Sequence, residues 1–532
     1  MKPHGLLDAQ SAQLLDFDWL AEKLAPVSPY GERCFSQLEP FRAGNEEAAQ
    51  ERARRIAEVA AEVEADCLAA VRAELEGVAD VSSAVARASI GETLHDPDFL
   101  ELRGFCRSIE RIDGLLAGSS LLEIGSDATS AVLSALDTGS ATVTEFYLAD
   151  GFEPELASAR AALAQAQAEL DAVRGREMHR IAQSLGRDEI GEEFVLMRAD
   201  LRGPLPAGVR VVREGPTYLL CAVEHEEPYL AALERHQAAF EAVATAEARV
   251  RSRLSAVVAQ QAAGVNAATV ALGHLDVMLA AVNFCRRYNC VVATVLRKPA
   301  LAFEQGRFAP MEAELAAAGR GFIPIDLDFA GAAVLTGPNM GGKSVTLQTC
   351  GFLALLVAFG IPVPAAAAQI ALFDRIAWLG LGGEQYKGGL LSTFAQELVT
   401  LKAILAYDAA RLLVLADEFA RTTTPHEGRA LVVALLECLR KRVACALVAT
   451  HLQGIARAAQ VRHLAVRGLR EIPRLRDVGD LSDALAQLAK AMDYRIVEVG
   501  SDDVPQADAI ALAELLGMEP SFVEAAYRAL SQ

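Results

Sequence analysis

The sequence is poor in aromatic residues, in basic charge and in paired cysteines. Aromatic side chains make up 6% of its 532 residues, and the hydrophobic content of 52% comes mainly from alanine and leucine. This composition favours a helix-rich globular protein of more than one domain. The formal net charge of −20 disfavours non-specific binding to nucleic acid, because phosphate contacts need a basic surface.

The sequence also lacks a disulfide framework and an uninterrupted membrane span. Its nine cysteines are scattered, and the spacing of Cys285 and Cys290 is not that of a metal-binding knuckle. The N-terminus has no apolar signal core. The most apolar stretch, 351–372, is interrupted by Gly360 and two prolines, which favours a buried helix followed by a turn. We therefore expect a cytoplasmic protein with reduced thiols and no membrane association.

A glycine-rich segment follows an apolar run at 332–336 and precedes a long apolar stretch from Val345. Strand, glycine loop and helix start are the setting of a phosphate-binding loop, whose backbone N–H groups face a polyphosphate. Lys343 is predicted to reach the β and γ phosphates, and Ser344 to hold Mg²⁺. The alternative is a chance match in a turn. The predicted nucleotide-binding residues are Gly337, Pro338, Asn339, Met340, Gly341, Gly342, Lys343 and Ser344.

A second apolar run begins at Arg411 and ends in the carboxylates Asp417 and Glu418. A buried parallel strand with this ending is typical of nucleotide hydrolases. We expect Asp417 to orient Mg²⁺, directly or through water, and Glu418 to position and polarise the attacking water. The alternative is a strand end that happens to be acidic.

Two further residues are candidates for the catalytic site. A third apolar run ends at Thr450 and His451, and His451 is predicted to contact the γ phosphate and to sense its loss. Ser392 precedes a predicted helix that carries Glu397, so its hydroxyl can cap that helix or contact a phosphate. A structural histidine and a plain helix cap are the alternatives.

The chain divides into four expected segments. Residues 1–150 form a helical core, and 151–260 form two long paired helices with a small β-rich insert between them. Residues 261–320 form a helical connector. Residues 321–532 alternate strands and helices, which predicts an α/β P-loop ATPase domain at the C-terminus with a parallel sheet. The paired helices act either as a lever or as an ordinary hairpin packed on the core.

These motifs resemble the ATPase domain of the MutS family. Thr336–Ser344 is close to that family's signature loop, and the matching segments that follow in order include Asp417-Glu418 and Thr450-His451. Upstream, Leu275-Asp276-Val277 resembles the helix that leads into the ATPase domain. The resemblance implies an ABC-type ATPase that uses ATP and Mg²⁺ and works as a homodimer with composite sites. Ser392 would then act across the dimer.

The sequence departs from the DNA-repair members of that family in three respects. We find no mismatch-reading domain with its Phe-x-Glu wedge, the insert between the paired helices is short, and the loop 419–428 is altered. Ala420 and Thr422 replace two glycines of the family's loop. The altered loop resembles a branch of the family that reactivates adenosylcobalamin-dependent lysine aminomutase.

Two functions therefore remain open. The first is an ATP-driven remodelling factor that reactivates a protein partner, with lysine aminomutase as the candidate. The alternative is a DNA mismatch-repair or recombination type of ATPase that binds mismatched or branched double-stranded DNA. In that case Arg198, Arg202, Arg210 and Arg213 of the insert are predicted to contact phosphates or, alternatively, only to solvate a small sheet.

Overall fold

The computed structural model describes most of the chain and divides it into two compact units. The residues described are 1–3, 5–117, 124, 127–137, 146–201, 203–338, 342–380, 393–407, 411–442, 444–469, 492–500, 510, 513 and 518–530. The first unit comprises Met1–Glu76, Leu115–Glu123 and Val270–Gln532, and the second comprises Gly77–Gly114 and Ile124–Thr269. The fold is mixed α/β, with a helical part and three sheets. The finer division into four segments remains a prediction.

A six-stranded sheet organises the first unit. Its strands, in spatial order, are β13 (Met492–Glu498), β12 (Arg462–Leu469), β7 (Ala332–Thr336), β11 (Ala444–Ala449), β10 (Leu412–Asp417) and β9 (Arg375–Gly380). All neighbours pair in parallel except β12 and β13, which are antiparallel. The parallel strands are almost continuous apolar runs, as expected when helices cover both faces.

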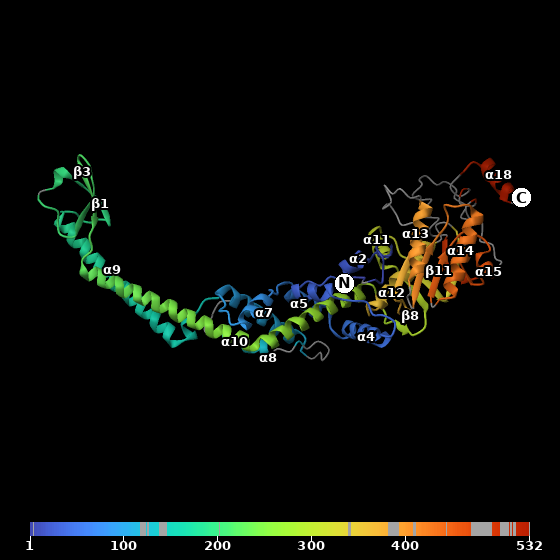
Figure 1. Ribbon diagram of the computed structural model, residues 1–532, viewed down its shortest axis with the longest axis horizontal. Coiled ribbons are helices and arrows are strands. Elements are labelled where there is room, and N and C mark those ends of the chain that lie inside the picture. Colours follow the sequence, from blue (N-terminus) through green and yellow to red (C-terminus); the bar gives the residue numbers. More distant parts are fainter. Residues whose placement is uncertain are drawn as a thin grey trace. The chain divides into compact units, whose positions relative to one another are not determined.

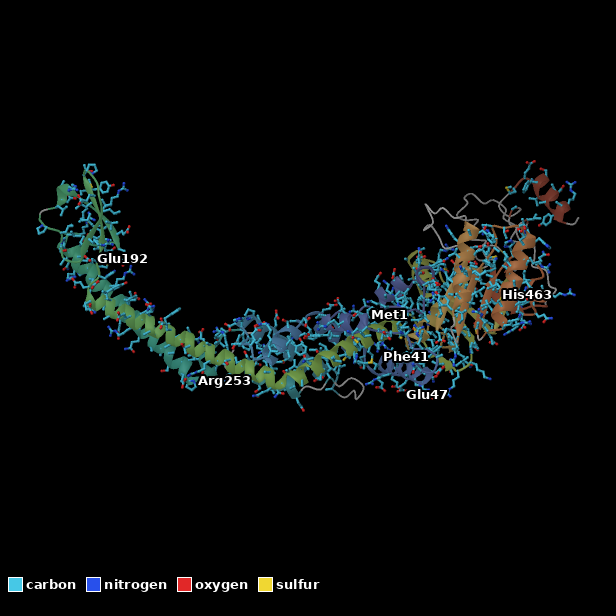
Figure 2. All side chains as sticks on the ribbon, viewed as in Figure 1. Met1, Phe41, Glu47, Glu192, Arg253 and His463 are labelled. Carbon is cyan, nitrogen blue, oxygen red and sulfur yellow. The ribbon has the colours of Figure 1, made fainter. Side chains whose placement is uncertain are left out.

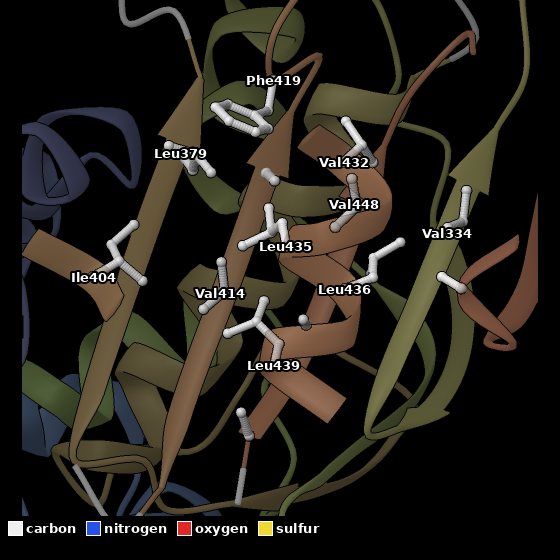
Figure 3. Close-up of a cluster of buried hydrophobic side chains, with 14 of the residues drawn as sticks. Val334, Leu379, Ile404, Val414, Phe419, Val432, Leu435, Leu436, Leu439 and Val448 are labelled. Carbon is white, nitrogen blue, oxygen red and sulfur yellow. The ribbon is translucent and has the colours of Figure 1, made fainter. Parts of the chain in front are cut away.

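Helices cover the two faces of this sheet, and the side chains of β10 show how. The helices are α12 (Lys343–Ala358), α13 (Thr393–Ala406), α14 (Pro425–Arg440) and α15 (Ile455–Ala459), and a further helix, α18 (Pro520–Leu530), follows β13 in the chain. Val414 belongs to the core cluster that also contains residues of α13 and α14, as Figure 3 shows. Leu415 points to the other face, where it lies against Gly351 of α12.

A second sheet of four strands precedes the first in the chain. In spatial order it contains β4 (Thr294–Leu296), β8 (Ala367–Ala371), β5 (Ala300–Gly306) and β6 (Ile325–Ala330), and α11 (Ala309–Ala317) connects β5 to β6. Gly331, with a φ of +68°, is the single residue between β6 and β7. The chain therefore passes directly from the second sheet into a central strand of the first.

Short N-terminal helices belong to the first unit and are bonded to its sheet. They are α1 (Ala9–Leu14), α2 (Phe17–Lys23), α3 (Pro29–Ser36), α4 (Glu46–Glu62) and α5 (Ala65–Glu76). The backbone N–H of Ile376 donates to the carbonyl of Leu6 at 2.8 Å. The N–H of Trp378 donates to the hydroxyl of Ser11 at 2.9 Å. Strand β9 is thus completed by residues from the beginning of the sequence.

The second unit contains α6 (Ser82–Ser89), α7 (Asp96–Leu115), α8 (Asp127–Leu136), a 3₁₀ turn at Asp150–Phe152 and a long helix pair. The pair is α9 (Pro154–Ser184) with α10 (Glu227–Arg287), whose last residues belong to the first unit. The ion pairs Arg160–Glu247, at 2.9 Å, and Arg235–Glu169, at 3.3 Å, show that the two helices run antiparallel (Figure 1).

A three-stranded antiparallel sheet lies between α9 and α10 in the chain. Its order is β1 (Glu193–Met197), β3 (Tyr218–Val223) and β2 (Val209–Glu214), with a 3₁₀ turn at Arg198–Asp200. One face packs on Ile181 of α9 through alternating residues such as Phe194 and Cys221. Figure 2 shows Glu192 at this end of the helix pair and Arg253 farther along α10. The small sheet is therefore an ordered module with its own apolar core.

Helix α10 is the one described helix that is long and apolar enough to cross a bilayer. An 18-residue window of it has a mean hydropathy of 1.5, and 61% of that window is buried inside the protein. A core helix passes the same test, so this feature alone is weak support for a membrane span.

Candidate nucleotide-binding site

The predicted phosphate loop lies between β7 and α12. Gly342, which precedes the helix, has a φ of +80°, a backbone conformation that favours glycine. A Cβ on this residue would also approach Tyr494 to 3.1 Å. The carbonyl of Gly342 accepts hydrogen bonds from the N–H and the hydroxyl of Thr346, both at 2.9 Å. These bonds form the first turn of the helix. Asn339, Met340 and Gly341 lie outside the described residues.

Lys343 is the first residue of α12, and its side chain turns back over the loop. It is only 6% exposed. Its ammonium group donates to the carbonyls of Gly337 and Pro338, both at 2.9 Å. Burial lowers the pKa of Lys343, and the nearby carboxylates of Glu418 and Asp417 oppose that effect. A buried ammonium that has only carbonyl acceptors is suited to bind an anion in the same place.

Ser344 and Asp417 connect the start of α12 to the end of β10. The hydroxyl of Ser344 donates to the Asp417 carboxylate at 2.7 Å. Burial raises the pKa of Asp417, the Ser344 bond lowers it, and the charge of Glu418 raises it further. A hydroxyl and a carboxylate held together are oxygen ligands of the kind that Mg²⁺ prefers. No group of three or more His, Cys, Asp or Glu residues that could hold a metal occurs in the described part of the chain.

Glu418 begins the loop after β10. Its backbone N–H donates to the carbonyl of Ala449, the last residue of β11, at 3.0 Å. Its carboxylate pairs with Arg421 at 2.7 Å, and the Arg421 side chain is 59% exposed. The first cause of the raised pKa of Arg421 is this bond. Glu418 therefore has a defined position between the ends of two neighbouring strands.

A pocket of about 440 Å³ opens beside these groups. One end is polar, with Lys343, Ser344 and Glu418, and the rest is largely apolar. The apolar and flanking residues are Met311, Leu315, Arg320, Gly321, Phe322, Ile323, Ile325, Gly342, Val345, Thr346 and Tyr494. The sequence analysis did not identify this apolar part, because its residues come from α11, from the segment before β6 and from β13. The apolar run at 322–325 is the one local sequence feature that could have indicated this apolar wall.

Of the other predicted catalytic residues, His451 does not line the pocket in the described structure. His451 follows β11 and is exposed, and it is not among the described residues that line the pocket. Its neighbour Thr450 is buried, and the N–H of Thr450 donates to the carbonyl of Leu335 at 3.0 Å. Ser392 lies outside the described residues. The roles of both residues remain predictions.

A buried histidine that the sequence analysis did not single out lies behind the loop. His463 of β12 bonds through Nε2 to the hydroxyl of Thr336 at 2.9 Å and through Nδ1 to the carbonyl of Gly500 at 3.0 Å. A carbonyl only accepts, so Nδ1 is assigned as the donor to Gly500. His463 thus holds the last residue of β7, directly before Gly337.

The sequence comparisons agree with this geometry. Residues 333–529 match the family model described as MutS domain V. The chain is 25% identical to an Endonuclease MutS2 of Ruminiclostridium cellulolyticum over 482 residues, 86% of this chain and 57% of that protein. It is 34% identical to an Endonuclease MutS2 of Geobacillus thermodenitrificans over 206 residues, 38% of this chain and 26% of that protein. It is 34% identical to a DNA mismatch repair protein MutS of Granulibacter bethesdensis over 201 residues, 37% of this chain and 22% of that protein. The chain spans 57% of the length of the Ruminiclostridium cellulolyticum relative and about a quarter of the length of the other two.

Proposed function

The chain is a MutS-family protein, and we propose that it binds ATP with Mg²⁺ and hydrolyses the terminal phosphate bond. One observation carries the proposal. Lys343, Ser344 and Glu418 line the same end of one pocket, and Asp417 is bonded to Ser344. Motifs separated by more than 70 residues in the sequence therefore meet in the arrangement that phosphoryl transfer needs.

Each of these residues has a role that follows from its position. Lys343 exchanges its carbonyl partners for phosphate oxygens, and Ser344 and Asp417 hold Mg²⁺, which neutralises charge on the transferred group when bound. Glu418 accepts the proton of the attacking water or orients that water. The apolar part of the pocket, with Phe322 and Ile323, suits a planar base.

The experiment is direct. Purified protein is titrated with ATP in the presence of Mg²⁺ and of EDTA, and phosphate release is followed. We expect saturable ATP binding and Mg²⁺-dependent release. Absence of both with a folded protein would refute the proposal.

We propose DNA as the target that ATP binding controls. The names of the relatives, an endonuclease and a DNA mismatch repair protein, support this choice over a protein partner. The aminomutase interpretation depends on the altered loop 419–428, the short insert between the paired helices and the Leu15-Asp-Phe-Asp18 segment, and the comparisons give it no support. Two assays distinguish the two functions. The first compares binding to mismatched duplexes and four-way junctions with binding to a perfect duplex. The second measures whether the protein reactivates an inactivated lysine aminomutase.

The small sheet is a poor candidate for the DNA contact. Between 186 and 226 the sequence has five arginines, no lysine and eight carboxylates. Arg198 is engaged with Glu214 at 2.7 Å and with the carbonyl of Gly215. Arg202 lies outside the described residues. We therefore place the DNA contact on another surface, since a net acidic module repels phosphates.

The remaining parts of the proposal are a cytoplasmic homodimer that closes on ATP and a Ser392 that completes the partner's site. Sedimentation or light scattering with and without ATP and Mg²⁺ tests the dimer.

A further inference from the structure

The loop that carries Glu418 has an unusual backbone. Glu418 has a φ of +48° and Ala420 a φ of +63°, so two residues with side chains adopt the left-handed conformation within three positions. Residues other than glycine adopt this conformation rarely, and they keep it when the surrounding structure holds them. The position of the Glu418 carboxylate thus depends on what restrains Ala420.

Glu397 supplies that restraint from another element. It lies on α13, is only 4% exposed, and its Oε2 accepts the backbone N–H of Ala420 at 3.0 Å. Its other oxygen, Oε1, is buried with no hydrogen-bond partner. Burial raises the pKa of Glu397, and the N–H of Ala420 opposes that effect.

Besides the pair of Glu418 with Arg421 within the loop, the other contacts named for this loop are apolar or involve the backbone. Phe419 and Ala420 are 1% and 2% exposed within the core cluster between the sheet and α14, and Figure 3 shows Phe419 at the end of β10. A Cβ on Gly428 of α14 would lie 3.0 Å from the carbonyl oxygen of Ala420. Glu397 is therefore a polar side chain of α13 that reaches this loop.

Stability alone does not explain a glutamate at this position. A buried carboxylate with one unsatisfied oxygen is costly, and an apolar side chain of similar volume would remove that cost. The hydrogen bond to Ala420 is what an apolar residue could not provide. Its evident result is a fixed backbone from Glu418 to Ala420.

We propose that Glu397 is a positioning residue for ATP hydrolysis, which holds the left-handed backbone at Ala420 so that the Glu418 carboxylate faces the nucleotide pocket. The inference rests on the proposed ATPase function. Glu397 itself is not among the described residues that line the pocket, so it acts through the loop and not on the substrate.

The test compares Glu397→Gln with Glu397→Leu. Glutamine keeps an acceptor oxygen for the Ala420 N–H, so kcat should stay within about threefold of the unmodified protein. Leucine removes it, and kcat should fall by about tenfold or more while KM and the ATP dissociation constant change less than about twofold. Equal kcat in the two variants, or an equal loss of kcat and of ATP affinity in the leucine variant, would overturn the proposal.

A matched control separates positioning from plain stability. Glu46 is also buried, at 8% exposure, and its carboxylate accepts the N–H of Gly44 and pairs with Arg411, away from the pocket. Glu46→Leu should lower the melting temperature and leave kcat unchanged. If Glu46→Leu lowers kcat as much as Glu397→Leu does, a general loss of stability explains both, and the proposal fails.

A second experiment uses Ala420→Gly, because glycine adopts a φ near +60° without strain. In the Glu397→Leu background this change should restore part of kcat, and no recovery would contradict the proposed restraint. If the Glu397→Leu variant does not fold, hydrogen exchange of the unmodified protein tests the proposal instead. We expect the Ala420 amide to exchange slowly, and exchange at the rate of an open loop would overturn the inference. If the unmodified protein does not hydrolyse ATP, the proposed function fails instead.

Discussion

The hydroxyl of Ser344 donates a hydrogen bond to the carboxylate of Asp417 at 2.7 Å. The two residues are 73 positions apart in the chain, one at the start of α12 and one at the end of β10. We predict that Asp417→Asn weakens Mg²⁺ binding, so that the Mg²⁺ concentration that half-saturates ATP turnover rises by about tenfold or more. Turnover measured across a Mg²⁺ titration checks this. An unchanged half-saturation point would remove Asp417 from the metal site.

Lys343→Ala should weaken ATP binding by about ten- to a hundredfold, because a charge-assisted hydrogen bond in a buried place is lost. Titration with a fluorescent ATP analogue measures the change. Lys402→Ala is the control, since Lys402 is exposed on α13 and outside the pocket. If the two variants bind ATP equally well, Lys343 is not a phosphate ligand.

Glu418→Gln should retain ATP binding and lose turnover by about a hundredfold or more, because an amide cannot accept the proton of the attacking water. ATP binding and phosphate release are measured on the same preparation. Arg421→Gln removes the partner of Glu418 and leaves the carboxylate, so it is the informative comparison. Near-normal release by the Glu418 variant would assign the base to another residue.

The pH dependence of stability provides a check on Glu397. Its pKa is raised by burial above the usual 4.5, so its stabilising contribution is complete below that pH and is lost as the pH rises through the folded-state value. Burial of the carboxylate therefore costs stability as the pH rises above 4.5. Glu397→Gln should therefore be more stable than the unmodified protein at pH 7, with an advantage that shrinks as the pH falls towards 4.5. Urea unfolding of both proteins at pH 7 and pH 5 measures the difference in their free energy of unfolding. A difference that grows on acidification would contradict the prediction.

The acidic small sheet gives a prediction for DNA binding. If Arg210 and Arg213 each contacted a phosphate, replacing both with alanine would reduce the slope of log K against log salt by about two. We expect a change of less than one, because carboxylates outnumber arginines in this module. Fluorescence anisotropy with a labelled junction at several salt concentrations decides. A slope reduced by two would show that Arg210 and Arg213 contact DNA phosphates, so that the small sheet binds DNA.

The sequence was most informative where one local pattern determines the structure. The apolar runs ending at Thr336 and Asp417 are strands. The small β-rich insert expected between the paired helices forms three short strands. In each of these segments apolar periodicity and turn residues agree.

Elsewhere the determining contacts are distant in the chain. The sequence analysis expected the paired helices to end at 260 and a separate helical connector to follow, whereas α10 is continuous over Glu227–Arg287. Gly264 and Gly273 lie within this helix at packing positions. A Cβ on Gly264 would lie 2.3 Å from the Cβ of Ala128, and one on Gly273 would lie 2.8 Å from the carbonyl oxygen of Tyr30.

The candidate site also contains residues that the sequence predicted and residues that it could not predict. The phosphate-loop residues and the Asp417-Glu418 pair follow from motifs, because their spacing is set by a short loop. The apolar pocket wall, His463 and the bond from Glu397 to Ala420 depend on which elements lie side by side. No periodicity within one segment specifies such neighbours.

On the edge of β9 that does not pair with β10, the N–H groups of Ile376 and Trp378 donate to Leu6 and Ser11, and Ser11 is 367 positions from Trp378. During synthesis at about 5 to 20 residues per second, these early residues would leave the ribosome roughly 20 to 70 seconds before their partners. They must stay unpaired for that interval, so the nascent chain has a long window in which a chaperone can bind. A protein trimmed to residues 321–532 would lack this bonding altogether and should expose β9 to aggregation.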